Sequence, residues 1–217
     1  MYNAKAYMSA LIGALQNAFG KRLVYVGLQG SYLRDEATET SDIDPMVVID
    51  QLTRNDLATY RTIIAQLPDP VNSCGFICGR EELAHWNPLE ISHLLHATRD
   101  EYGILAALVP AYDERDIRSF IQLSIGNLYH ELCHRYVHAS AEKNRTKLPF
   151  TCKNVFFILQ NLHHLRTGVF CPTKRELLDH LTGDDLAVMQ LALKPADDFE
   201  FAFDRLLRWC RQTLASL

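Results

Sequence analysis

Strand-like and helix-like patterns occupy separate halves of this chain, and that separation constrains the fold more than any other feature. Short apolar runs of strand length occur only before about residue 110: Leu23 to Leu28, Ile43 to Ile49, Ser73 to Cys78 and Leu89 to Leu95. From about Asp113 onward, apolar residues recur at helical spacing and no further strand is predicted. The sequence therefore predicts an α+β chain, with a small mixed sheet in a domain over residues 1–110 and a helical bundle over residues 111–217.

Helix boundaries and one proline refine this prediction. The segment Met8 to Phe19 reads as a helix that Gly20 ends, and Thr53 can cap a helix that Pro68-Asp69-Pro70 stops. Pro45 cannot donate to a sheet ladder, so it favours an edge or bulged strand for Ile43 to Ile49. In the second half we expect helices over residues 113–138, 151–166, 173–181 and 197–215.

Length and charge exclude several classes of protein. A chain of 217 residues with 48% hydrophobic residues is long enough to fold around its own core, without a metal or disulfide staple. The net charge of -4 argues against a protein whose main task is to bind nucleic acid. The longest apolar stretch is about eleven residues, short of the roughly 18 that a membrane span needs, and no signal peptide is evident. We therefore expect a cytoplasmic protein that makes no contact with a membrane.

The stretch from Gly27 to Asp50 carries the chemistry. Gly30-Ser31 follows a predicted strand, and ten residues later comes Asp42-Ile43-Asp44 at the start of the next one. Two carboxylates at i and i+2 on a strand point to one face and can share a hard divalent cation. Backbone amides and the Ser31 hydroxyl at such a turn can hold a phosphate. A phosphate-binding turn beside a metal-binding carboxylate pair is what phosphoryl or nucleotidyl transfer requires, whereas the alternative is an acidic turn leading into an ordinary strand.

At these residues the chain resembles the nucleotidyltransferase superfamily, and within it the kanamycin nucleotidyltransferase-like and minimal nucleotidyltransferase groups. The resemblance implies a small mixed sheet flanked by helices, two Mg²⁺ ions, and transfer of a nucleoside monophosphate from ATP or another NTP to a hydroxyl. It implies that Gly30 and Ser31 bind the nucleotide phosphates and that Asp42 and Asp44 hold the metal. We expect the active site in the cleft between the sheet domain and the helical bundle.

The sequence departs from the family at the third carboxylate, which the next strand usually supplies. The expected position falls near Gly75, where no acid is present. Glu90 is the substitute that we predict, on a neighbouring strand, while Glu81 and Glu82 read as a solvated helix start. The departure leaves open a weakened metal site or an inactive relative.

In the second half, the helix around Glu131 and Arg135 resembles the kanamycin-enzyme helix that supplies a catalytic Glu and, one turn later, a basic residue. The resemblance implies that Glu131 is the general base and that Arg135 faces nucleotide phosphate; a surface ion pair is the alternative. A basic stretch follows, which we read as a loop able to close over a triphosphate, with Lys153 at the start of the next helix as a nucleotide-binding candidate. Its other members are Lys143, Arg145 and Lys147.

Two competing interpretations use the same half of the chain. The segment His130 to His134 is literally HExxH, and His138 extends that helix face, so a zinc hydrolase is the first alternative. The second is an antitoxin that adenylylates a partner protein, because minimal nucleotidyltransferases also act in that way. The toxins they modify carry an Arg and a His separated by four to six residues, a pattern that the segment Arg175 to His180 fits.

The function predicted is therefore Mg²⁺-dependent transfer of AMP from ATP to a hydroxyl of a small molecule, such as an aminoglycoside-like acceptor. The GS and DxD motifs address only the nucleotide, so the acceptor and the base preference are left open. The resemblance to kanamycin-type enzymes, which form dimers, also leaves a homodimer open.

Overall fold

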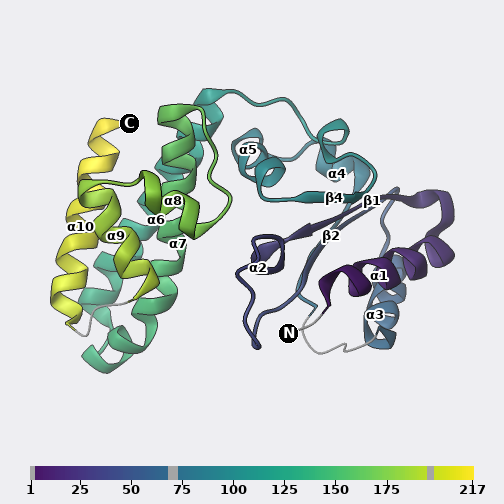
Figure 1. The fold of residues 1–217 in the computed structure, drawn as a ribbon, viewed down its shortest axis with the longest axis horizontal. Coiled ribbons are helices and arrows are strands. Elements are labelled where there is room, and N and C mark those ends of the chain that lie inside the picture. The colour runs from purple at the N-terminus through teal and green to yellow at the C-terminus, as the bar shows by residue number, and fades with distance from the viewer. Residues whose placement is uncertain (1–2, 68–72, 195–197) are drawn as a thin grey trace. The chain divides into compact units, whose positions relative to one another are not determined.

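The structure is a computed structural model that describes residues 3–67, 73–194 and 198–217, with the side chains of residues 149, 150 and 153 excepted. The chain divides into two compact units, Met1–Tyr112 and Asp113–Leu217, each of which we describe by itself (Figure 1). The assignment of functions to residues 1–110 and 111–217 stays a prediction.

The first unit is built on a four-stranded mixed sheet in the order β3-β2-β1-β4 (Figure 1). Strand β1 (Leu23–Gln29) is antiparallel to β2 (Asp44–Ile49) and to β4 (Arg99–Tyr102), whereas β2 is parallel to β3 (Phe76–Gly79). The predicted α+β class with a small mixed sheet is therefore confirmed.

Alternation along the strands places an apolar core on each face of the sheet. On one face Val47 and Ile49 pack in a cluster with α1 (Ala4–Phe19) and α3 (Arg54–Gln66). On the other face Met46 and Val48 pack with residues of α4 (Arg80–Ala84) and α5 (Pro88–His96). Figure 1 shows the two pairs of helices on opposite sides of the strands. Short helical turns complete the unit, namely η1 (Gly20–Arg22), α2 (Gly30–Leu33) and η3 (Leu105–Ala107).

The predicted edge position of the strand that contains Pro45 is wrong. Strand β2 lies between β1 and β3 and is central. The sheet tolerates the proline because Pro45 is only the second residue of β2, and the continuous pairing with β3 starts one residue later at Met46.

The predicted strand over Leu89 to Leu95 is also wrong, since these residues lie in helix α5. Asn87 caps this helix by accepting a hydrogen bond from the Leu89 amide at 3.3 Å. Pro88 occupies the first turn, where its lack of an N–H costs no helical hydrogen bond. The fourth strand is the polar segment β4, which no apolar pattern marks. Two side-chain hydrogen bonds join the β4 region to β1: Tyr25 donates to Asp100 at 2.7 Å, and Gln29 donates to Thr98 at 2.8 Å.

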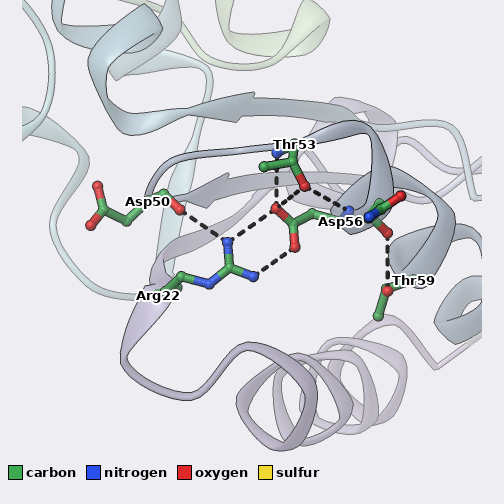
Figure 2. Close-up of polar contacts among 6 residues, drawn as sticks. Arg22, Asp50, Thr53, Asp56 and Thr59 are labelled. Atoms are coloured by element: carbon green, nitrogen blue, oxygen red, sulfur yellow. Dashed lines mark hydrogen bonds and ion pairs between the residues drawn. The ribbon is translucent and has the colours of Figure 1, made fainter.

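Thr53 caps helix α3, as predicted, and the first turn of the helix holds a polar network (Figure 2). Thr53 and Asp56 form a capping box, and the Arg22 guanidinium donates to both carboxylate oxygens of Asp56 at 2.6 and 3.0 Å. The same guanidinium donates to the Asp50 carbonyl at 3.4 Å. This network ties the start of α3 to the turn before β1. The predicted stop at residues 68–70 lies outside the described residues.

The second unit is helical, as expected. Its helices are α6 (Glu114–His138), α7 (Ala141–Thr167), α8 (Lys174–His180), α9 (Gly183–Leu193) and α10 (Phe199–Ser216). Helix α7 begins ten residues before the predicted start at Thr151, so the basic stretch from Lys143 to Lys147 is helical and the predicted loop is wrong. Helix α9 was not predicted. Among the described residues, none of the helices combines the length and the apolar character that a membrane span needs.

Candidate active site

Gly30 and Asp44 meet at one end of the sheet. The antiparallel pairing of β1 and β2 sets Gln29 opposite Asp44, so the chain leaves β1 directly beside the DxD strand. Gly30 adopts φ +73°, a left-handed backbone conformation that residues other than glycine rarely take. A Cβ at this position would also lie only 2.7 Å from Cγ of Asp44. The backbone conformation therefore favours glycine, and a side chain at this position would have to displace the Asp44 carboxylate.

Asp42 and Asp44 interact electrostatically, as their i, i+2 spacing predicts. Asp42 is exposed and Asp44 is half-buried. Burial raises the pKa of the Asp44 carboxyl, and the negative charge of Asp42 raises it further, while Arg34 lowers it. Two hard oxygen ligands that repel each other suit a divalent cation, which would relieve the repulsion. The chemistry of this donor pair therefore fits Mg²⁺.

Arg34 is a site residue that the sequence analysis missed. It follows the Gly30-Ser31 turn by one helical turn and lies close enough to Asp44 to lower its pKa. Arg34 Nε donates to Glu36 at 3.1 Å, and both side chains are largely buried. Arg34 also affects α5: burial lowers the pKa of His93 to about 4, and the charge of Arg34 acts in the same direction. The signal in the sequence was a lone basic residue between the two motifs.

Strand register identifies the place of the missing third carboxylate. Strands β2 and β3 pair in parallel with Met46 opposite Phe76, and Ile43 bridges to Ser73, so Cys74 is the residue in register with Asp44. An acid in register with Asp44 would therefore stand at Cys74, next to Gly75, near which the third carboxylate is predicted. A side chain at Gly75 would collide with the Pro45 backbone, because its Cβ would lie 3.0 Å from that carbonyl carbon. Cys74 is an exposed free thiol.

Glu90 does not take the place of the third acid on a strand. It lies in the first turn of α5, is exposed, and accepts a hydrogen bond from the Trp86 indole at 2.6 Å. Among the described residues, no three His, Cys, Asp or Glu side chains gather in a way that could hold a metal ion. The donor set at the DxD strand is therefore a pair of carboxylates.

In the helical unit, Glu131 and Arg135 form the predicted i, i+4 pair. Arg135 Nη1 lies 3.7 Å from Glu131 Oε1, and the same oxygen accepts from the Thr151 hydroxyl at 2.7 Å. Arg135 Nη2 donates to the Lys143 carbonyl at 3.1 Å. Both side chains thus connect α6 to α7, and neither is a simple surface charge. The side chain of Lys153 lies outside the described residues.

The histidines of the HExxH segment are exposed on α6. The ring centroids of His130 and His134 are 6.0 Å apart, and those of His134 and His138 are 4.7 Å apart. Within the part of the chain that the structure describes, these side chains belong to no group of three that could hold a metal ion. This geometry gives the zinc alternative no third ligand.

No family model matches the chain, and no curated protein matches its sequence. Among solved structures it is similar to spectinomycin adenyltransferase AAD(9) from Enterococcus faecialis, determined with ATP and spectinomycin. The similarity covers 96% of this chain and 100% of that chain, with 13% sequence identity and a TM-score of 0.57. The chain therefore has the fold of that nucleotidyltransferase.

Proposed function

We propose that this protein is a Mg²⁺-dependent nucleotidyltransferase that transfers AMP from ATP to a hydroxyl of a small molecule. The observation that carries the proposal is the contact of the Gly30-Ser31 turn with Asp44, beside Asp42. This contact supports our assignment of the turn to phosphate binding and of the carboxylate pair to metal binding. The fold shared with an adenyltransferase supports the same reaction class.

In this proposal residues 1–110 bind the nucleotide. The Ser31 hydroxyl and the backbone amides of the Gly30 turn hold the phosphates of ATP, and Asp42 and Asp44 hold Mg²⁺, of which the family resemblance implies two ions. The bound metal would neutralise charge on the phosphates as pyrophosphate leaves. Arg34 stabilises the ionised form of Asp44, which is the form that binds a cation.

Residues 111–217 supply the groups that act on the acceptor and on the phosphates. We assign to Glu131 the role of general base, which takes the proton of the acceptor hydroxyl as that oxygen attacks the α-phosphorus. Thr151 and Arg135 both contact Oε1 of Glu131, and this orients the carboxylate. Arg135 and Lys153 are the candidates for phosphate contacts.

An aminoglycoside-type compound is the acceptor class that we propose, because the similar structure was determined with ATP and spectinomycin. A cytoplasmic location and a homodimer stay expectations from the sequence and the family resemblance. Size-exclusion chromatography with light scattering tests whether the protein forms a homodimer.

The test is pyrophosphate release from Mg²⁺-ATP with a panel of hydroxyl acceptors that includes spectinomycin. We expect release that depends on one acceptor, and a Glu131→Gln variant slowed by about a hundredfold with Mg²⁺-ATP affinity unchanged. Glu114→Gln, which alters an exposed acid on the same helix, is the matched control and keeps wild-type turnover. Loss of ATP affinity in Glu131→Gln would argue that this residue binds the nucleotide and is not the base.

A further inference from the structure

A basic hollow lies where α6 ends and α7 begins. Its volume is about 560 Å³. The walls come from the last turns of α6, the connection and the first two turns of α7, and the charged or titratable residues among them are His134, Arg135, His138, Glu142, Lys143 and Lys147. We call this feature the corner hollow. All of its walls belong to the helical unit, so its shape depends on that unit alone.

Charge in the corner hollow has one predominant sign. Arg135, Lys143 and Lys147 are basic, and Glu142 is the one carboxylate among the residues that line the hollow, while Glu131 pairs with Arg135 at 3.7 Å from outside the lining. Lys143 and Lys147 are four residues apart on α7, so both ammonium groups lie on one face of the helix. The exposed imidazoles of His134 and His138 add hydrogen-bond donors from α6. This is a local excess of positive charge in a chain whose net charge is -4.

Helix α7 adds to that excess through its backbone. It starts at Ala141, between the lining residues Ser140 and Glu142, and its 27 residues give a full helix dipole with the positive end at this point. Ser140 caps the helix by accepting from the Lys143 amide at 3.4 Å. Arg135 is held in the wall by its hydrogen bond to the Lys143 carbonyl. The cations therefore come from a defined α6–α7 packing and not from a run of lysines on one exposed segment.

We propose that the corner hollow is a binding site for a phosphate-bearing anion. Several cations and a helix N-terminus around one hollow suit a group with two or more negative charges, and they disfavour a polycationic acceptor such as an aminoglycoside. This site shares Arg135 with the phosphate contacts of the proposed function and rests on it to that extent, but it requires neither Asp42 and Asp44 nor Mg²⁺. Two sources of the ligand share the same chemistry: the triphosphate of ATP, or a separate phosphorylated compound.

Calorimetric titration of tripolyphosphate into the full-length protein, in EDTA, tests the site without the metal. We expect one-to-one binding by the wild type and a loss of about tenfold in affinity in Lys143→Gln. The matched control is Arg145→Gln, which removes a cation from the same part of α7 but lies outside the walls of the hollow, and we expect it to bind within about twofold of wild type. Ser31→Ala, which alters the phosphate-binding turn of the proposed active site, should also bind tripolyphosphate normally, and this separates the hollow from that site.

Two outcomes overturn the proposal: no binding by the wild type at millimolar tripolyphosphate, or equal losses in Lys143→Gln and Arg145→Gln, which would indicate non-specific attraction. Circular dichroism of each variant confirms that it is folded. Titration of Mg²⁺-ATP into Lys143→Gln then identifies the source of the ligand. Weakened ATP binding means that the hollow takes the triphosphate of the nucleotide, and unchanged ATP binding means that it takes a separate phosphorylated compound.

Discussion

Gly30 and Asp44 are separated by thirteen residues, yet the Asp44 carboxylate occupies the space that a side chain at position 30 would need. Strand pairing produces this contact, since β1 ends and β2 begins at the same end of the sheet. The spacing of the motif in the sequence, a short loop between two strands, is what allows the pairing to be antiparallel and tight. The two halves of the motif thus form one structural feature.

Gly30→Ala tests that feature directly. The added methyl would meet the Asp44 carboxylate and would require φ +73°, which costs an ordinary residue about 1 to 2 kcal/mol. We expect lower thermal stability and a loss of Mg²⁺-dependent ATP binding, measured by thermal shift and calorimetry.

Gly13→Ala is the control for this substitution. Gly13 lies within helix α1, and a Cβ there meets nothing within 4 Å, so the change should leave ATP binding alone and stabilise the helix by roughly 0.5 to 1 kcal/mol. Wild-type ATP affinity in Gly30→Ala would contradict the site geometry.

Which site residues the sequence identifies depends on how local their signal is. Gly30, Ser31, Asp42 and Asp44 form a compact pattern that can be read without a fold, whereas the relevance of Arg34 depends on the fold that brings it close to Asp44. Glu90 was misplaced because its apolar surroundings suggested a strand. Roles for Glu131 and Arg135 came from family resemblance, and the structure adds their contacts with α7.

At the scale of elements, the parallel register of β2 and β3 determines where a third carboxylate would lie. Cys74 is in register with Asp44, so a side chain at that position projects to the same face of the sheet. We expect Cys74→Asp to raise the Mg²⁺ affinity of the ATP complex several-fold, because a third anionic oxygen ligand joins the pair. Magnesium titration at fixed ATP measures this change.

Cys74→Asn is the matched control, since it has the same shape as the aspartate without the charge. It should leave the Mg²⁺ dependence near that of the wild type. In the absence of metal, Cys74→Asp should be less stable than Cys74→Asn, because three carboxylates then repel one another. Identical Mg²⁺ dependence in the two variants would show that position 74 does not face the carboxylate pair.

The start of α3 gives a prediction on pH. Hydrogen bonds from Arg22 and then from Thr53 hold the pKa of Asp56 well below its usual value of 3.8 (Figure 2). A depressed pKa in the folded state contributes stability above pH 3.8, and this contribution is lost as the pH falls from there through the folded-state pKa. Asp56→Asn should therefore be less stable at neutral pH and should lose less stability on acidification.

Urea unfolding at neutral pH and at about pH 3 measures both effects. Asp179→Asn removes an exposed carboxylate on α8 and serves as the reference. If Asp56→Asn has the acid sensitivity of the wild type, the Arg22–Asp56 pair does not contribute to the pH dependence of stability.

Element prediction succeeded where apolar pattern and capping agreed. Strands β1 and β2 are continuous apolar runs, and α3 and α6 begin at capping boxes. Element prediction failed for β4 because that strand is mostly exposed and has no apolar pattern. Strand β4 joins the sheet through its own backbone and through the hydrogen bond from Tyr25 to Asp100. In α5, the Asn87-Pro88 helix start was a better guide than the apolar run that follows it.

At the scale of the whole molecule, the change of pattern near residue 110 predicted a sheet-containing part followed by a helical part, and the structure has two such units. The likeness to a spectinomycin adenyltransferase along 96% of the chain concerns both units. The acceptor lies beyond sequence reasoning for a physical reason, because in the proposed function the GS and DxD residues would contact only the nucleotide and the metal.

Calorimetric titration of ATP with and without Mg²⁺, into the wild type and Asp44→Asn, tests the central claim most directly because it needs no acceptor. Asp35→Asn is the control, since it changes an exposed acid in the loop between the motifs and asparagine tolerates its φ of +54°. We predict Mg²⁺-dependent binding by the wild type and Asp35→Asn, and a loss of at least about tenfold in Asp44→Asn. Equal Mg²⁺-ATP affinity in the wild type and Asp44→Asn, or no binding by the wild type, would contradict a nucleotide site at the Gly30–Asp44 contact.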